Sequence, residues 1–291
     1  MPWLQLTFYS NKDKAEALAD LLSETGAAAV SMQDAADQPL YEPPPGATPL
    51  WQLTNVVALF DENSDGGGVI EQLKAAWPEA LPEYRSEILA DQDWERAWMD
   101  DFKPMKFGER LWIVPSWHEA PQQDGVNILL DPGLAFGTGT HPTTRLCLEW
   151  LDGQALHAKR VIDYGCGSGI LAIAAALLGA ASVIGVDNDP QALVATQDNA
   201  QRNGVSILTS LPAEVPQNSV DILLANILAG PLIELAPKLA ALVKPGGLIA
   251  LSGILPDQAN GVRQTYAQWF NMEAPVEVDG WIRLEGKKRT D

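Results

Sequence analysis

The alternation of apolar strand-like segments with helical segments, from residue 141 onward, constrains the fold more than any other feature. Buried strands are expected at 160–165, 182–187, 219–225 and 248–253, with a short apolar piece near 207–211. Helical stretches are expected between them, at 168–180, 190–203, 229–243 and 256–270. Repeated strand–helix–strand units with apolar strands predict an α/β fold, in which helices cover both faces of a parallel sheet.

The end of the chain departs from this alternation. Residues 274–287 form two strand-like runs that meet at Asp279-Gly280, a dipeptide typical of tight hairpin turns. A parallel sheet that finishes in an antiparallel hairpin differs from the all-parallel dinucleotide-binding fold. Short strands are also expected earlier, at 110–116 and 127–133.

The N-terminal 91 residues have a different order of elements. Alternating or apolar segments predict strands at 3–10, 27–34, 52–60 and 84–91, and helical spacing predicts helices at 12–26 and 68–77. The order β-α-β-β-α-β is that of a split βαβ, or ferredoxin-like, α+β domain. This segment contains neither histidine nor cysteine, so we interpret it as a recognition domain.

A tryptophan-rich segment, 92–108, separates the two patterns and is expected to be a helical linker. Trp94, Trp98 and Phe102 recur at a spacing that lines one face of a helix. Such a stripe either docks one domain on the other, which we favour, or forms an aromatic cage for a substrate. The expected organisation is therefore domain 1–91, linker 92–108 and domain 109–291.

The net charge of −19 is distributed unevenly along the chain. Residues 1–91 carry 15 acidic and 4 basic side chains, and residues 92–291 carry 23 and 15. Nucleic-acid binders neutralise phosphates with Lys and Arg, so a free nucleic-acid substrate is disfavoured. An acidic surface attracts a basic protein partner, or it only keeps the protein soluble; both readings stay open.

Several other classes of protein are disfavoured by what the sequence lacks. Two cysteines and three histidines without paired spacing offer no disulfide framework and no expected metal site. No apolar run reaches the roughly 18 residues of a membrane-spanning helix. The N-terminal residues lack the order of a signal peptide, and we expect a cytoplasmic protein. Without a long heptad pattern, a monomer is expected.

The glycines of 161-VIDYGCGSGILAIAAA-176 are the strongest chemical signal. Gly165, Gly167 and Gly169 lie between a strand and a helix, where they allow a tight turn and the close approach of a ligand to the backbone. Their G-x-G-x-G spacing differs from the G-x-G-x-x-G of dinucleotide binding. A turn selected only for packing is the alternative.

Polar residues at two further strand ends are placed to contact a ligand bound at the glycine turn. Asp187 follows roughly twenty residues later, where an acidic side chain accepts hydrogen bonds from ribose hydroxyls. Asp189-Pro190 is better interpreted as the N-cap and first turn of the next helix. Asn226 ends another strand, where its side chain can orient a substrate amine or, alternatively, cap the following helix.

The loop 131-DPGLAFGTGTHPTT-144 has the glycines and threonines of a phosphate-binding loop but no lysine. A P-loop places Lys and then Ser or Thr directly after its last glycine, so this loop is not one. His141 within it either caps the following helix or contacts the site, and the sequence does not decide between these roles.

The stretches VIDYGCGSG, VDND and ANILAGPL resemble motifs of class I S-adenosylmethionine-dependent methyltransferases. Together with DWERAWMDDFKPMKFG and DPGLAFGTGTHPTT, they make the chain similar over essentially its whole length to the bacterial ribosomal protein L-eleven methyltransferases (PrmA). This resemblance implies a Rossmann-like class I methyltransferase domain. It also implies that residues 136–144 cover a cofactor without phosphate, S-adenosyl-L-methionine. The implied cofactor contacts are Phe136, Gly137, Thr144, Gly165, Gly167, Asp187 and Asn226.

By the same resemblance, the reaction is methyl transfer to lysine side chains and the N-terminal amine of ribosomal protein L-eleven. An in-line displacement needs a neutral, aligned amine more than a dedicated general base. Another protein or a small amine is the alternative substrate. A nicotinamide-dependent dehydrogenase is disfavoured by the glycine spacing, the terminal hairpin and Asn226, and a catalytically inactive relative by the intact motifs.

Overall fold

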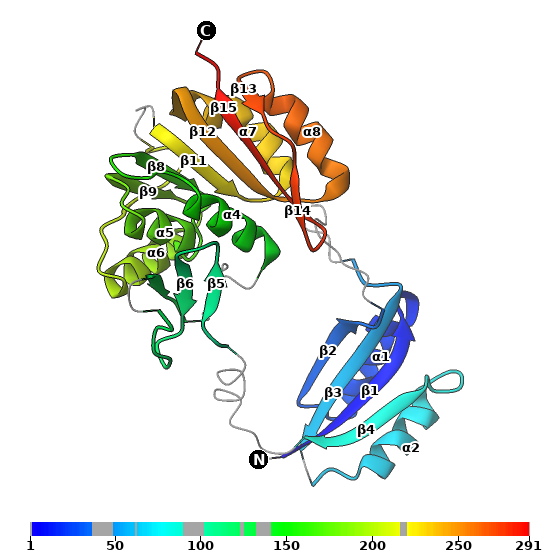
Figure 1. Ribbon diagram of the computed structural model, residues 1–291. Coiled ribbons are helices and arrows are strands. Elements are labelled where there is room, and N and C mark those ends of the chain that lie inside the picture. The colour runs from blue at the N-terminus through cyan, green and yellow to red at the C-terminus, as the bar shows by residue number, and fades with distance from the viewer. Residues whose placement is uncertain are drawn as a thin grey trace. The chain divides into compact units, whose positions relative to one another are not determined.

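The computed structural model describes residues 2–36, 49–61, 63–89, 102–122, 125–131, 141–215 and 220–290. They belong to two compact units, Met1–Asp100 and Asp101–Asp291, which are drawn in Figure 1. Trp94 and Trp98 of the expected linker lie outside the described residues, so the aromatic stripe stays a prediction. Residues 105–107, which the sequence assigns to that helical linker, instead form a short strand.

The first unit has the predicted β-α-β-β-α-β order. Its elements are β1 (Trp3–Asn11), α1 (Lys12–Glu24), β2 (Ala29–Asp34), β3 (Leu53–Asp61), α2 (Gly66–Ala76) and β4 (Tyr84–Leu89). The strands form an antiparallel sheet in the order β2-β3-β1-β4. Alternate residues of β1 and β3, such as Phe8 and Phe60, share one core with the apolar faces of both helices. This period of two is what the sequence alternation predicts.

The second unit contains a small sheet and a large one. The small sheet joins β5 (Met105–Phe107), β6 (Leu111–Val114) and β7 (Val126–Leu129). The large sheet has the order β10-β9-β8-β11-β12-β15-β13. Its strands are β8 (Arg160–Tyr164), β9 (Ser182–Val186), β10 (Leu208–Ser210), β11 (Val220–Asn226), β12 (Val243–Ile254), β13 (Phe270–Met272), β14 (Val276–Val278) and β15 (Trp281–Lys288). The five strands from β10 to β12 pair in parallel, as the sequence predicts.

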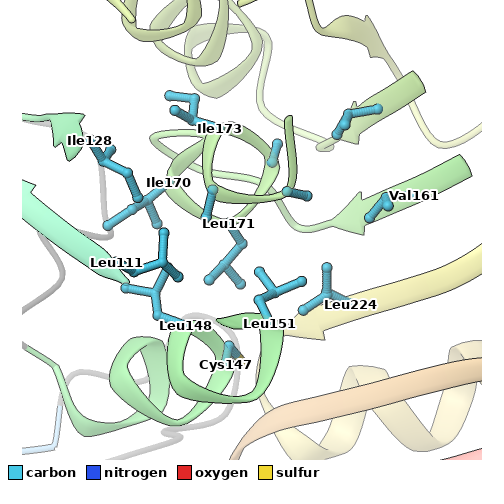
Figure 2. Close-up of a cluster of buried hydrophobic side chains, with 14 of the residues drawn as sticks. Leu111, Ile128, Cys147, Leu148, Leu151, Val161, Ile170, Leu171, Ile173 and Leu224 are labelled. Carbon is cyan, nitrogen blue, oxygen red and sulfur yellow. The ribbon is translucent and has the colours of Figure 1, made fainter. Parts of the chain in front are cut away.

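Helices cover both faces of the large sheet, in accord with the predicted doubly wound fold (Figure 1). The helices are α4 (Pro142–Asp152), α5 (Ile170–Leu177), α6 (Pro190–Arg202), α7 (Ala229–Leu242) and α8 (Pro256–Tyr266). Residues of α4 and α5 pack with Val161 and Leu224 on one face, together with Leu111 of β6 (Figure 2). Residues of α7 and α8 pack with Ile162 and Leu223 on the other. Neighbouring strand residues thus enter opposite cores.

The predicted terminal hairpin is confirmed. Val278 of β14 pairs with Trp281 of β15, and both intervening residues have positive φ, 49° at Asp279 and 74° at Gly280. Positive φ at both central residues is what a type I′ turn requires. β15 then continues antiparallel between β12 and β13. The predicted helix 256–270 is too long, because α8 ends at Tyr266 and the strand β13 begins at Phe270.

Candidate cofactor site

The glycine turn after β8 requires glycine for its backbone conformation. Gly165, Gly167 and Gly169 have φ values of 82°, 53° and 80°, in the left-handed region that L side chains rarely adopt. Gly169 is the N-cap of α5, which begins at Ile170. The sequence reading of a tight strand-to-helix turn is therefore confirmed.

Two of these glycines also meet close neighbours. A Cβ at Gly165 would overlap the side chain of Ile227, and a Cβ at Gly169 would lie 2.8 Å from Cγ2 of Thr196. Packing thus explains Gly165 and Gly169 without a ligand. It does not exclude ligand binding, because Gly165 and Gly167 remain partly exposed at the end of the strand.

Asp187 connects the glycine turn to the end of β9. One oxygen of its half-buried carboxylate accepts from the backbone N–H of Gly167 at 2.9 Å, and the other accepts from Asp189 N–H at 3.0 Å. Each carboxylate oxygen has a second lone pair, so the group keeps acceptor capacity for a ligand hydroxyl.

Asp189 has the separate role that its sequence context predicts. Its side chain accepts from the N–H of Gln191 at 2.8 Å and caps α6, with Pro190 as the first helical residue. The two neighbouring carboxylates are therefore distinguished by their contacts. Asp187 lies against the glycine turn, and Asp189 serves the helix.

Asn226, at the end of β11, meets Thr144, in the first turn of α4. The side-chain amide of Asn226 donates a long hydrogen bond of 3.5 Å to the Thr144 hydroxyl. Thr144 is 1% exposed and lies on the first turn of α4. The alternative that Asn226 caps the next helix is wrong, since the N-cap of α7 is Leu228 and no side chain caps that position.

The turn after Asn226 holds three strand ends together. The backbone of Ile227 lies so close to Gly253 that a Cβ there would overlap the Ile227 carbonyl oxygen, and its side chain packs on Gly165. Gly253 also has a positive φ of 83°. The carboxyl ends of β8, β11 and β12 therefore meet around Ile227.

His141 is the N-cap of α4, one of the two roles left open by the sequence. Its Nδ1 accepts from the N–H of Thr143 at 3.3 Å and lies 2.8 Å from the Thr143 hydroxyl oxygen. The ring packs edge-on against Trp281, with centroids 4.8 Å apart. Partial burial lowers the pKa of His141, which favours the neutral ring that this cap requires.

Asp163 is a polar residue of this region to which the sequence reading assigns no role. Its carboxyl group is buried at the end of β8, where one oxygen accepts from Ala172 N–H at 3.1 Å. The other oxygen has no hydrogen-bond partner among the described residues. Burial raises the pKa of Asp163 to about 7, and the nearby charge of Asp187 contributes in the same direction. An acidic residue inside an apolar strand is the signal that could have identified it.

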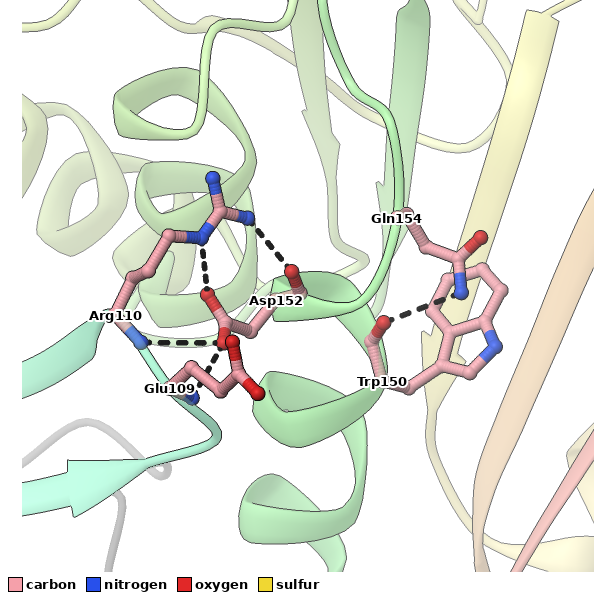
Figure 3. Close-up of polar contacts among 5 residues, drawn as sticks. All are labelled: Glu109, Arg110, Trp150, Asp152 and Gln154. Carbon is pink, nitrogen blue, oxygen red and sulfur yellow. Dashed lines mark hydrogen bonds and ion pairs between the residues drawn. The ribbon is translucent and has the colours of Figure 1, made fainter.

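The far end of α4 is anchored by the turn between β5 and β6 (Figure 3). The Asp152 carboxylate accepts from the N–H groups of Glu109 and Arg110 at 2.6 and 3.2 Å, and from Arg110 Nε at 3.1 Å. Arg110 Nη2 donates to the Asp152 carbonyl at 2.6 Å. Gln154 adds a bond of 3.3 Å to the Trp150 carbonyl. These contacts fix the helix that carries Thr144 at its other end.

Phe136 and Gly137, expected in the loop over the cofactor, lie outside the described residues.

Cys147 and Cys166 are both buried, and burial raises the pKa of each thiol to about 12, which disfavours a thiolate nucleophile. In the described ranges no group of three or more His, Cys, Asp and Glu side chains is placed to hold a metal ion. No helix in those ranges has the length and apolar character to cross a membrane.

Comparison with known proteins gives one family. The family model of the ribosomal protein L11 methyltransferase (PrmA) matches residues 2–289. The ribosomal protein L11 methyltransferase of Pseudomonas aeruginosa is 56% identical over 294 residues that cover all of both chains, and that of Marinobacter nauticus is 57% identical over 99% of each. The solved ribosomal protein L11 methylase of Lactobacillus delbrueckii subsp. bulgaricus is 34% identical, with a TM-score of 0.60, over 65% of this chain and 100% of that one. The chain belongs to the ribosomal protein L11 methyltransferase family.

Proposed function

We propose that this protein transfers methyl groups from S-adenosylmethionine to ribosomal protein L11, with lysine side chains and the N-terminal amine as acceptors. The observation that carries the proposal is the convergence of the glycine turn, Asp187 and the Asn226–Thr144 pair at the carboxyl edge of the parallel sheet. Ligands bind at this edge in open α/β sheets. Membership of the family supports the reaction and the partner.

The residues at this edge fit S-adenosylmethionine. The ligand carries no phosphate, so a glycine turn without lysine suits it. In our proposal Asp187 accepts from its ribose hydroxyls, the backbone at Gly165 and Gly167 contacts it, and Thr144 and Asn226 complete the described part of the site. Phe136 and Gly137 are proposed to add contacts from the preceding loop. When bound, S-adenosylmethionine supplies a methyl group on a sulfonium that departs as a neutral thioether.

The acceptor amine has to be neutral to attack. At pH 7, deprotonation of a lysine with pKa near 10.4 costs about 4–5 kcal/mol, against about 1 kcal/mol for an α-amino group. Exclusion of water beside a positive sulfonium lowers the lysine pKa and offsets part of that cost. The side-chain oxygen of Asn226 is proposed to accept a hydrogen bond from the amine and to orient its lone pair. His141 is not proposed as a base, because its Nδ1 caps α4.

The acidic N-terminal domain, residues 1–91, is proposed to bind the protein substrate. Its 15 acidic side chains against 4 basic ones suit a basic partner through complementary charge. The linker 92–108 is proposed to let domain 1–91 present different amines to domain 109–291. We further propose that the protein acts in the cytoplasm as a monomer.

Mass spectrometry of L11 after incubation with the protein and S-adenosylmethionine tests the function. Mass gains in whole methyl increments are expected. They should be lost with Asn226→Ala and kept with Asn260→Ala, a matched change of an exposed asparagine on α8. Unmodified L11, together with cofactor binding in calorimetry, would contradict the substrate and point to another protein or a small amine. Absence of binding would contradict the cofactor.

A further inference from the structure

Arg283 is a buried cation on the face of β15 that meets α4. Its neighbours Ile282 and Leu284 point into the core formed with α7 and α8. Because strand residues alternate, Arg283 and Glu285 point to the other face, and Arg283 is only 9% exposed. A charge in such surroundings is retained only with close partners, because taking it out of water is costly.

The guanidinium of Arg283 joins this strand to the interior of α4. Nη1 donates to the backbone carbonyl of Leu146 at 2.9 Å, and Nη2 donates to Oε2 of Glu285 at 2.6 Å. The carbonyl of Leu146 is an unusual partner for a charged group, since it already lies within a helix. The contact therefore fixes the position of α4 on the sheet, while Nε of Arg283 has no hydrogen-bond partner among the described residues.

A second strand side chain holds the same helix one turn earlier. The hydroxyl of Ser252 lies 3.3 Å from the carbonyl oxygen of Thr143 and 3.4 Å from that of Ile282. Ser252 is the register partner of Asn226 in the sheet. The two tied carbonyls, of Thr143 and Leu146, lie on either side of Thr144.

This arrangement has a direct consequence for the Thr144 hydroxyl. Its bond to Asn226, at 3.5 Å, lies at the limit for a hydrogen bond, so a small shift of α4 breaks it. We infer that Arg283 is a positioning residue for the cofactor site, which holds the first turn of α4 so that Thr144 meets Asn226. The inference rests on the proposed function, in which both residues contact S-adenosylmethionine.

Arg110 supplies a matched control, because it anchors the same helix at its opposite end. It binds Asp152 through two donors, whereas Arg283 acts near Thr144. Loss of either arginine loosens the docking of α4. Only the loss of Arg283 is expected to move Thr144.

Calorimetric titration with S-adenosylhomocysteine, below the unfolding temperature of every variant, tests the inference. Arg283→Met should raise Kd roughly tenfold, in line with the cost of a misplaced site, while Arg110→Met leaves Kd within about twofold. The decisive variant combines Arg283→Met with Thr144→Ala. If Arg283 acts through Thr144, the double variant binds no more weakly than Thr144→Ala alone, because the two effects couple.

Additive effects in the double variant would overturn the inference, since Arg283 would then act by another route. So would an unchanged Kd in Arg283→Met alongside weaker binding in Thr144→Ala, a result that leaves the proposed site intact. Unchanged binding in Thr144→Ala would instead contradict the proposed role of Thr144 and the inference with it. Should Arg283→Met fail to fold, Arg283→Lys takes its place, because it keeps the charge and loses the two-point contact.

Discussion

The amide of Asn226 donates to the hydroxyl of Thr144 across 82 positions of sequence, at 3.5 Å. Asn226 ends a central strand, and Thr144 lies in the first turn of a helix. Their meeting brings the first turn of α4 to the strand end that the sequence identifies as a binding edge. The relationship makes both side chains testable with small substitutions.

We expect Asn226→Ala to lower the rate of methyl transfer to L11 by roughly 10²-fold, because an orienting group on the acceptor amine is lost. Thr144→Ser, which keeps the hydroxyl, should stay close to the unsubstituted protein, whereas Thr144→Ala should bind the cofactor less tightly. Single-turnover rates and calorimetry measure the two effects separately. An Asn226→Ala protein with an undiminished rate would remove Asn226 from the mechanism.

Substitutions of the neighbouring residues Asp187 and Asp189 should have different effects, the first on cofactor affinity and the second on protein stability. Asp187→Asn is expected to weaken cofactor binding by roughly tenfold or more, because hydrogen bonds to a charged acceptor are the stronger ones. Asp189→Ala removes the N-cap of α6 and should cost about 1 kcal/mol of stability, with little effect on Kd. Calorimetry and urea unfolding of the pair provide the comparison. Equal losses of affinity in both variants would contradict the assignment of Asp187.

Stability should depend on pH through Asp163. Burial raises the pKa of this carboxyl from 3.8 to about 7, so the folded state holds its proton over a range in which the unfolded state has released it. The free energy of unfolding is therefore expected to fall as pH rises from about 4 to 7, and this loss is absent in Asp163→Asn. Urea unfolding of both proteins at pH 5 and pH 8 measures the difference. If the difference in free energy of unfolding between the two proteins is the same at both pH values, Asp163 does not titrate in this range.

Two arginines that pair with acidic residues of α4 should differ in their contribution to stability, because the carboxylates of their partners differ in burial. Arg110 and Arg145 have the same side-chain exposure, 52%, but the carboxylate of Asp152 is 4% exposed and that of Glu149 is 32% exposed. Arg110→Ala leaves a buried carboxylate without its cation, and after allowance for the exposed arginine it should cost about 1–3 kcal/mol. Arg145→Ala should cost about 0.3–0.5 kcal/mol, as is usual for a surface pair. Thermal unfolding of the two variants distinguishes them, and similar losses would refute the argument.

The elements with a clear local pattern were predictable from the sequence. The parallel strands, the hairpin turn at Asp279-Gly280 and the cap at Asp189 follow from periodicity and turn chemistry, which act over a few residues. The bounds of α4 were not predicted, although the N-cap His141 followed by Pro142 is a good helix start.

Other parts depend on distant residues and left no local signal. β13 is three residues long and is a strand because it pairs with β15, while the apolar Trp269-Phe270 also continues a helical period. In the sequence, Arg283 and Glu285 have the spacing of an ordinary surface ion pair on a strand. Arg283 is buried only because α4 packs over it. The Asn226–Thr144 contact likewise required the fold, since periodicity carries no information on which strand end meets which helix.

Ile227 couples the ends of three strands at the binding edge, because it packs against glycines at two of these ends and follows the third strand. Its side chain excludes any substituent at Gly165, and its carbonyl excludes one at Gly253, so three strand ends share one set of contacts. A larger residue at either glycine has to displace the turn that carries Asn226. Substitutions at these three strand ends are therefore coupled through Ile227, and their effects on stability are not expected to add.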